Sequence, residues 1–271
     1  MMNKRIINAI TTLKMDYFVI CLAALIGSGL TLFSGFGLGT LLVPVFGLFF
    51  PIEIAIILTA IVHFLNNLFK LVLLGRSANI NVVLRFGIPA IIFAFLGAYI
   101  LSLLTDTPAL MDYQLGNHTF EIQPIKLIIG IVLLFFSLFE VVPSLSNLQF
   151  DKKYLPIGGV LSGFFGGLSG NQGALRAAFL IRANLSKQSF IATGVVIACL
   201  VDISRLSIYA EKIIKHHTNF DYTLITLATL SAFIGAYFGN KLLAKVTIKT
   251  IQNIVTVMLI LFSVLLILGI L

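Results

Sequence analysis

The sequence predicts an all-α polytopic membrane protein of about eight transmembrane helices, arranged as two four-segment repeats with the first helix of each repeat broken. Three observations predict it. Of the 271 residues 59% are hydrophobic and only 10% are charged, with a mean hydropathy of +1.09, whereas soluble domains carry roughly 25% charged residues. Apolar segments of about 20 residues, the length that spans a bilayer, recur along the chain. The second half also repeats short stretches of the first.

The N-terminal segment, residues 1–16, contains Lys4, Arg5 and Lys14. Basic residues beside a membrane segment favour the cytoplasmic side, so we expect a cytoplasmic N-terminus. The apolar run that follows has no convincing small-x-small cleavage site. It therefore predicts an uncleaved first helix over 17–33, continuing brokenly to residue 50, rather than a signal peptide.

The other apolar segments divide evenly between two halves, a first repeat over 17–147 and a second over 148–271. They lie at 52–74, 82–104, 125–146, 155–182, 187–209, 221–243 and 248–271. The polar connection 105–124 carries three acidic residues and no Lys or Arg. It is the best candidate for an external loop.

Three matches at nearly one spacing support the duplication. The stretch "AFLGAYI" at 94–100 returns as "AFIGAYF" at 232–238, and Ser34-Gly35 returns as Ser169-Gly170, 135 residues later. At that second spacing Asn67 and Lys70 match Asp202 and Arg205. Eight full spans would make the repeats parallel, whereas a re-entrant segment 155–182 would make them inverted. We expect eight spans because the two broken segments match, although charge counting leaves both arrangements open.

The two predicted breaks, at 34–39 and 166–173, are too rich in glycine for one packing face. Each glycine weakens a helix by about 1 kcal/mol relative to alanine, and the side chains of Ser169, Asn171 and Gln172 compete for backbone hydrogen bonds. Non-helical backbone at membrane depth occurs where it is buried in protein or lines a cavity. Matched breaks in two halves therefore indicate a transporter binding site. The alternative is helix packing alone, which also explains small-xxx-small pairs elsewhere in the chain.

Charged side chains near the breaks favour an anion. Arg176 falls in the first turn of the helix that restarts at about 174, where a cation is unfavourable unless an anion or a carboxylate compensates it. The alternative is that Arg176 snorkels from a shallow helix. Asp202 and Arg205 share a helix face at i,i+3, so structural pairing is as good a reading as a functional role. The matching face of the first half has Lys70 but no acid.

The breaks and the charges near them supply the candidate site residues. For substrate binding they are Ser34, Gly35, Gly37, Asn66, Asn67, Lys70, Ser169, Gly170, Asn171, Gln172, Gly173, Arg176 and Arg205, and for proton coupling Asp202. His63, one turn before Asn67, is a weak candidate, because a lone intramembrane histidine is more often structural. No catalytic or metal-ligand spacing and no nucleotide-binding loop occurs, so we expect no enzyme activity, no cofactor and no metal. Lys and Arg occur singly or in pairs, which argues against nucleic acid as a partner.

The breaks and the segments after them resemble the TauE/SafE family of sulfite and organosulfonate exporters. The resemblance rests on "GSGLTLFSGFGLGTLLVP" (27–44) and "GGVLSGFFGGLSGNQGALR" (158–176), and extends over about 20–268. It implies transport of small sulfur-containing anions, such as sulfite, sulfonates or sulfoacetate, across the bacterial inner membrane. The second copy has Asn171-Gln172 where the family has glycines, which bears on the substrate.

The leading functional hypothesis is a secondary transporter or facilitator for a small anion. A membrane potential of about 100 mV, negative inside, favours export of each negative charge by about 2.3 kcal/mol, whereas uptake would need coupling. The alternative is a membrane scaffold or assembly protein whose glycine-rich breaks serve only helix packing. Expected partners are the small anion and the lipid bilayer; the oligomeric state stays open, with a homodimer as one alternative.

Overall fold

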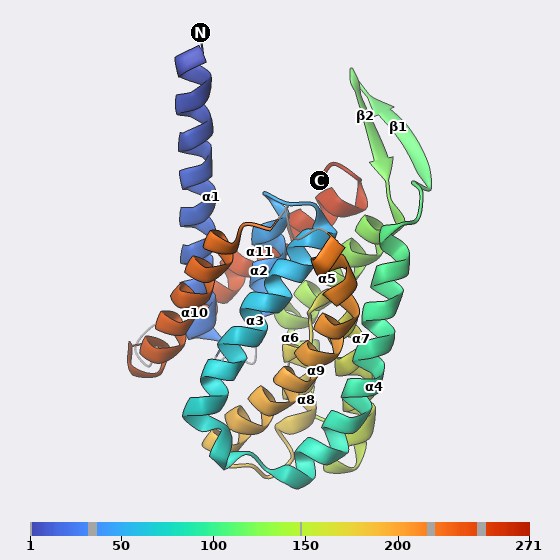
Figure 1. The fold of residues 1–271 in the computed structure, drawn as a ribbon. Helices are drawn as coiled ribbons and strands as arrows, with labels where there is room; N and C mark the ends of the chain where they lie inside the picture. The colour runs from blue at the N-terminus through green and yellow to red at the C-terminus, as the bar shows by residue number, and fades with distance from the viewer. Residues whose placement is uncertain (1, 32–36, 147, 216–219, 243–247) are drawn as a thin grey trace.

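The computed structural model describes residues 2–31, 37–146, 148–215, 220–242 and 248–271, and it is a bundle of helices with one short hairpin (Figure 1). Among these residues, four helices are long and apolar enough to cross a membrane. They are α3 (Ile52–Leu74), α4 (Ile80–Thr105), α9 (Lys187–Lys215) and α10 (Tyr222–Leu242). The prediction of a helical membrane protein is confirmed.

The shorter helices complete the bundle. They are α2 (Leu38–Gly47), α5 (Pro124–Val141), α6 (Pro143–Ser146), α7 (Leu155–Ser169), α8 (Gly173–Leu180) and α11 (Ile248–Ile267), with the 3-10 turns η1 (Gly75–Ser77) and η2 (Lys152–Tyr154). The first helix, α1 (Met2–Leu30), includes most of the predicted N-terminal segment and projects from the bundle (Figure 1).

The second break is a sharp turn between α7 and α8. Gly170 ends α7 with φ +80°, a left-handed conformation that glycine adopts without strain. The chain then turns back, so that a Cβ on Gly158, in the first turns of α7, would lie 2.4 Å from the ring of Phe179 at the end of α8. Residues 155–182 are therefore a helical hairpin, and the prediction of one spanning helix there is wrong.

The first break separates α1 from α2, and it lies against the second. A Cβ on Gly39 would lie 2.9 Å from the carbonyl oxygen of Gly170, and one on Gly37 would lie 3.7 Å from the amide nitrogen of Gly173. The predicted residues Ser34 and Gly35 fall outside the described residues. The two interrupted segments thus meet inside the bundle.

Matched helices of the two halves run in opposite directions. In Figure 1, α3 descends from the end that carries the hairpin while α9 ascends toward it, and α4 and α10 are opposed in the same way. Eight full spans would instead have made these pairs parallel. The direction changes because the α7–α8 hairpin returns the chain to the end from which it entered.

Glycines hold the helices at close distance. On α4, a Cβ on Gly97 would lie 2.1 Å from the carbonyl oxygen of Phe164 on α7; on α10, a Cβ on Gly235 would lie 2.0 Å from that of Leu25 on α1. Gly97 and Gly235 are the glycines of the two repeated stretches at 94–100 and 232–238. Close packing through small residues therefore explains these two glycines.

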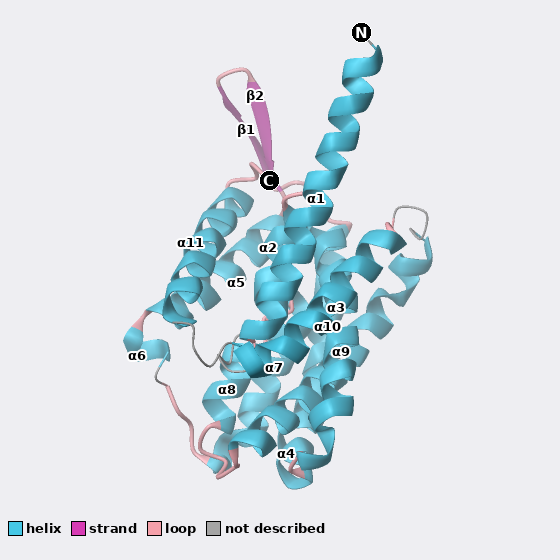
Figure 2. Ribbon diagram, turned by 90° about the vertical axis from the view of Figure 1, so that its left-hand side faces the viewer, coloured by secondary structure: helices cyan, strands magenta, loops and turns pink. Residues whose placement is uncertain are grey.

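The predicted external loop 105–124 contains a β-hairpin, β1 (Met111–Leu115) paired antiparallel with β2 (His118–Ile122). The Tyr113 hydroxyl donates to the carbonyl oxygen of Leu268 at 2.6 Å, which ties the hairpin to the C-terminal end of the chain. The hairpin and the N-terminal end of α1 lie at the same end of the molecule (Figure 2). A cytoplasmic N-terminus and an external 105–124 therefore cannot both be correct.

Candidate functional site

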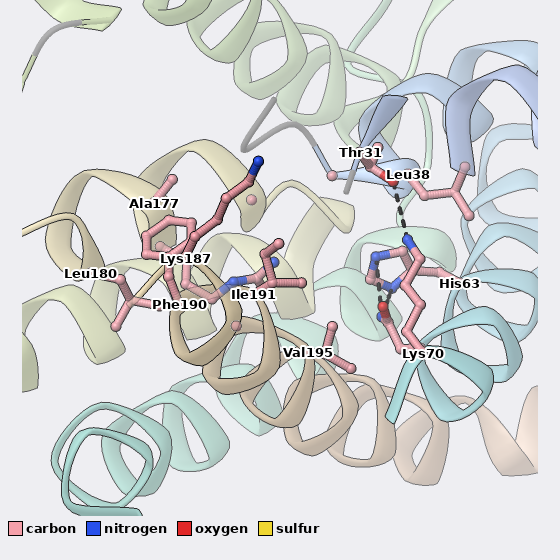
Figure 3. Close-up of a pocket in the computed structure, with 15 residues that line it drawn as sticks. Thr31, Leu38, His63, Lys70, Ala177, Leu180, Lys187, Phe190, Ile191 and Val195 are labelled. Carbon is pink, nitrogen blue, oxygen red and sulfur yellow. Dashed lines mark hydrogen bonds between the residues drawn. The ribbon is translucent and has the colours of Figure 1, made fainter. Parts of the chain in front are cut away.

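A cavity of about 130 Å³ lies beside the two breaks. Thr31 and residues of α2, α3, α8 and α9 line it. Figure 3 shows His63 and Lys70 of α3 on one side and Ala177, Leu180 and Phe190 of α8 and α9 on the other. The cavity combines polar groups near the breaks with an apolar wall, as is usual for small-molecule sites.

Three cationic side chains line this cavity, those of Lys70, Arg176 and Lys187, and the hydrogen-bond partners of the first two are neutral. Lys70 is 4% exposed, and its Nζ donates to Thr31 Oγ1 at 3.2 Å. With the Asn66 amide oriented so that both its oxygen and its nitrogen find partners, Nζ also donates to the Asn66 amide oxygen at 3.2 Å. Arg176 Nη1 donates to Gln172 Oε1 at 2.9 Å. Within the described residues neither of these two cations has a carboxylate within 4.0 Å, since both ion pairs found there belong to Asp202.

The N-termini of α2 and α8 also meet the cavity, through Gly37 and Gly173. The N-cap residues, Gly37 and Gln172, make no side-chain cap hydrogen bond. The first amide groups of both helices are therefore free of side-chain caps, and the positive ends of two helix dipoles point to one region. Such an arrangement favours a bound anion.

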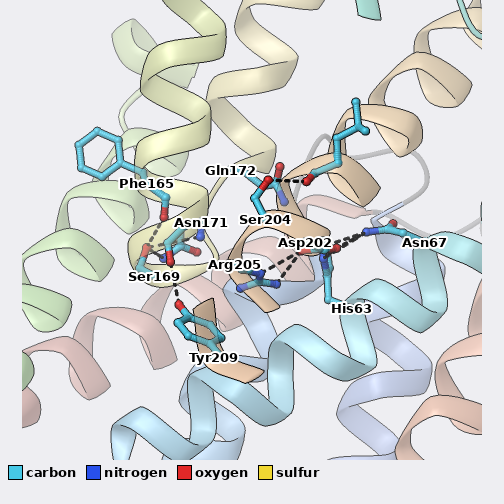
Figure 4. A network of polar contacts seen from close by, with 12 residues as sticks. His63, Asn67, Phe165, Ser169, Asn171, Gln172, Asp202, Ser204, Arg205 and Tyr209 are labelled. Atoms are coloured by element: carbon cyan, nitrogen blue, oxygen red, sulfur yellow. Dashed lines mark hydrogen bonds and ion pairs between the residues drawn. The ribbon is translucent and has the colours of Figure 1, made fainter. Parts of the chain in front are cut away.

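Asp202 forms a buried polar network behind the cavity (Figure 4). Its Oδ1 accepts from Arg205 Nε at 3.0 Å and lies 2.8 Å from Arg205 Nη2, so the expected i,i+3 pairing is present. Its Oδ2 lies 2.7 Å from His63 Nδ1 and accepts from Asn67 Nδ2 at 3.2 Å. Asn67 and Asp202, which the repeat places at matching positions, are thus in direct contact.

The predicted substrate-binding residues fall into three groups. Those that line the cavity are Gly37, Asn67, Lys70, Gly173 and Arg176. Asn66 and Gln172 hold the two cations from behind. The others described lie around the second break and beside Asp202, and they are Ser169, Gly170, Asn171 and Arg205; Figure 4 shows all of these but Gly170.

Several polar atoms near the second break are buried without a hydrogen-bond partner. They are Asn171 Oδ1, Gln172 Nε2, Arg205 Nη1 and Nη2, and Thr59 Oγ1. Of these, Arg205 Nη2 is within ion-pair distance of Asp202. Buried polar groups normally find partners, so this region carries unused hydrogen-bonding capacity.

Nine of the fifteen lining residues were not predicted from the sequence, Thr31, Leu38 and Lys187 among them, and His63 was undervalued. Thr31 and Lys187 line the cavity without any pattern that singles them out, and Leu38 supplies part of the apolar wall. His63 lies four residues before Asn67 on the same face of α3, a helical spacing that could have placed the two together. The lining places Arg176 at the cavity rather than at a lipid interface, which disfavours the snorkelling alternative.

Comparison with known proteins identifies the family of the chain. The family model "Sulfite exporter TauE/SafE" matches residues 19–266, nearly the whole chain. No curated protein and no solved structure matched. The chain is therefore a member of the TauE/SafE sulfite exporter family, a family of membrane transporters.

Proposed function

We propose that the protein is a secondary transporter or facilitator that moves a small sulfur-containing anion, of the sulfite, sulfonate or sulfoacetate class, across the bacterial inner membrane, with export favoured. The observation that carries the proposal is the cavity between the breaks, where Lys70 and Arg176 meet with neutral partners only. Two uncompensated cations at membrane depth are expensive, and a bound anion would offset that cost.

Each part of the site suits an oxyanion. The Arg176 guanidinium offers a planar fork of donors, the Lys70 ammonium is a compact point charge, and the helix ends at Gly37 and Gly173 offer backbone amides. The volume of about 130 Å³ restricts the ligand to a small one. We assign binding to these groups and to Asn67, with Asn66 and Gln172 as supports. We assign the other predicted residues, Ser169, Gly170, Asn171 and Arg205, to the opposite face of the breaks.

The transport mechanism that fits best is alternating access between two inverted repeats. Opposed directions of α3 and α9 support it, as does the contact of the breaks with each other. Equivalent contacts support it further: Gly97 meets Phe164, while its counterpart Gly235 meets Leu25, each across the two halves. In place of eight full spans, we propose that α1–α2 and α7–α8 are re-entrant pairs that enter from opposite sides.

The direction of transport depends on which end of the molecule the cavity leads to. The cavity reaches Lys187, which begins α9 close to the junctions where α4 and α7 begin and α8 ends. Basic residues flank these junctions along the chain, namely Arg76, Arg85, Lys152, Lys153, Arg182 and Lys187, whereas the connection 105–124 at the other end has no Lys or Arg. By the positive-inside rule we assign the end with these junctions to the cytoplasm, so that the cavity receives anions from inside.

The scaffold alternative explains the packing glycines but not the cations. Glycines such as Gly97 and Gly235 serve helix packing in either case. A scaffold has no need for Lys70 and Arg176 to face one cavity without carboxylates, and ion pairing or an apolar residue would cost less there. The transporter therefore accounts for more of the molecule.

A flux assay in proteoliposomes, with sulfite, sulfate, sulfonates, thiosulfate and carboxylates as candidates, tests the proposal. Arg176→Ala should abolish flux of the transported anion while leaving the melting temperature near that of the wild type. Arg182→Ala is the matched control, because Arg182 is exposed and six residues further along the chain. Failure of every anion to bind or cross, with a cation or a neutral solute accepted instead, would overturn the assignment.

A further inference from the structure

His63 stands between the cavity and the buried carboxylate of Asp202. It lines the cavity, and its Nδ1 lies 2.7 Å from Asp202 Oδ2. Asp202 itself is fully buried and lies outside the cavity lining. A proton that reaches this network from the cavity therefore meets His63 first.

The contacts of Asp202 decide which imidazole nitrogen can change its protonation. Asp202 already accepts from Arg205 on one oxygen and from Asn67 on the other, so it is placed as an acceptor. The imidazole then donates from Nδ1 to Oδ2, and Asp202 fixes the tautomer and the ring orientation. Nε2, which lies 3.4 Å from the amide nitrogen of Asn67, is then the nitrogen that gains or loses a proton.

We propose that His63 is the proton-binding residue of the transport site, taking up a proton at Nε2 when an anion occupies the cavity, with Asp202 as its positioning partner. This inference rests on the proposed function, and it moves the coupled proton from Asp202 to His63. Histidine suits the role because its charge changes near neutral pH.

The charges around His63 supply the coupling. Lys70 on its own helix and Arg205 on α9 are positive charges that disfavour an imidazolium, and the carboxylate of Asp202 favours one. Arg176 on α8 adds a further positive charge to the cavity that His63 lines. The neighbouring helix α2 has no titratable side chain, and the two tyrosines of α10 are exposed. An anion between Lys70 and Arg176 would offset their repulsion of the imidazolium. Anion and proton therefore strengthen each other's binding, a reciprocity that thermodynamics requires.

The coupling also bears on the driving force. A dianion that crosses with one proton still carries one negative charge outward, so the membrane potential continues to favour export. A monovalent sulfonate with one proton crosses as a neutral pair.

The test measures binding of methanesulfonate and of sulfate by titration calorimetry. Both anions stay unprotonated between about pH 5.5 and 8.5, so any pH dependence belongs to the protein. The wild-type dissociation constant should fall by roughly fivefold or more over that range as the pH is lowered, and titrations in two buffers should show proton uptake on binding. His63→Gln should bind with no such dependence and no uptake. His118→Gln, an exposed histidine on β2, should behave as the wild type.

A complementary variant keeps the inference testable even where His63→Gln fails to fold. In H118Q/H216Q/H217Q, His63 is the single remaining histidine of four, and proton uptake should persist. Loss of uptake in that variant, or a pH dependence retained in His63→Gln, would overturn the role of His63 while leaving the anion site intact. If neither anion binds to the wild type at any pH, the anion site itself is contradicted.

Discussion

At the scale of single residues, buried charges in this molecule do two different things. Asp202 and Arg205 are both fully buried and neutralise each other. We expect Asp202→Asn to lower the free energy of unfolding by about 3–5 kcal/mol, because it leaves the Arg205 guanidinium buried without its counter-charge. Thermal unfolding in detergent measures the effect, with the exposed Asp112→Asn on β1 as control. Equal melting temperatures for the two variants would contradict it.

Removal of the charge of Lys70 should not lower stability, in contrast to removal of the charge of Asp202. The partners of Lys70, which are Thr31 and Asn66, are neutral, so removal of the ammonium leaves no charge unpaired. Lys70→Met keeps most of the side-chain volume, and we expect the melting temperature to stay level or rise while anion affinity falls at least roughly tenfold, the equivalent of about 1.4 kcal/mol. A melting curve and a binding titration on the same preparation check both halves. A large loss of stability would mean that Lys70 is structural.

Part of this chemistry could be read from the sequence. The i,i+3 spacing predicts the Asp202–Arg205 pair, and the break predicts Arg176 in the first turn of a helix; the structure contains both. The contact between Asn67 and Asp202 could not be predicted from spacing along one helix, because it joins two halves of the chain. The proposed duplication does place the two at matching positions, and a two-fold relation between inverted repeats would bring such residues into contact.

At the scale of elements, two glycines that pack closely against a neighbouring helix, Gly97 and Gly235, give a pair of equivalent predictions. Gly97→Ala and Gly235→Ala should each lower the free energy of unfolding by about 1–3 kcal/mol, because the new Cβ would meet a backbone carbonyl that cannot rotate away. Gly87→Ala on α4 is the control, because its nearest neighbour is the flexible end of Leu200 at 3.2 Å. Thermal unfolding of the three variants measures this. A tolerated Gly235→Ala beside a damaging Gly97→Ala would mean that the two contacts are not equivalent.

The positions of the helices along the chain could be predicted from hydrophobicity and length, whereas the direction in which each helix crosses the bundle could not. The apolar segments at 52–74 and 82–104 coincide with α3 and α4 to within two residues, because hydrophobicity and length decide where a helix lies. Whether α8 continues α7 or turns back along it depends on tertiary contacts such as that of Gly158 with Phe179. Local sequence shows that a helix breaks; it does not show where the chain goes next.

At the scale of the whole molecule, two signals from the positive-inside rule compete. The three basic residues within 1–16 draw the N-terminus to the cytoplasm, while the acidic 105–124 is drawn outside. The structure places both at one end, where Lys126 at the start of α5 and Lys212 and Lys215 at the end of α9 also lie, opposite the six basic residues around the starts of α4, α7 and α9. These two groups thus have six basic residues each, and the proposed external N-terminus rests on the lack of Lys and Arg in 105–124, in contrast to the expectation from the N-terminal segment alone.

Cysteine labelling tests this orientation together with the inverted arrangement. In a C21A/C199A background, which removes both native cysteines, we expect Gln114→Cys on the hairpin to react with a membrane-impermeant maleimide in intact cells. Lys153→Cys and Arg182→Cys, both exposed at the basic end, should react only after permeabilisation. Eight parallel spans would instead place residue 182 on the side of residue 114, because a full span over 155–182 carries the chain across. Labelling of both Gln114→Cys and Arg182→Cys in intact cells would therefore refute the re-entrant hairpin. Labelling of Lys153→Cys and Arg182→Cys with protection of Gln114→Cys would instead reverse the orientation.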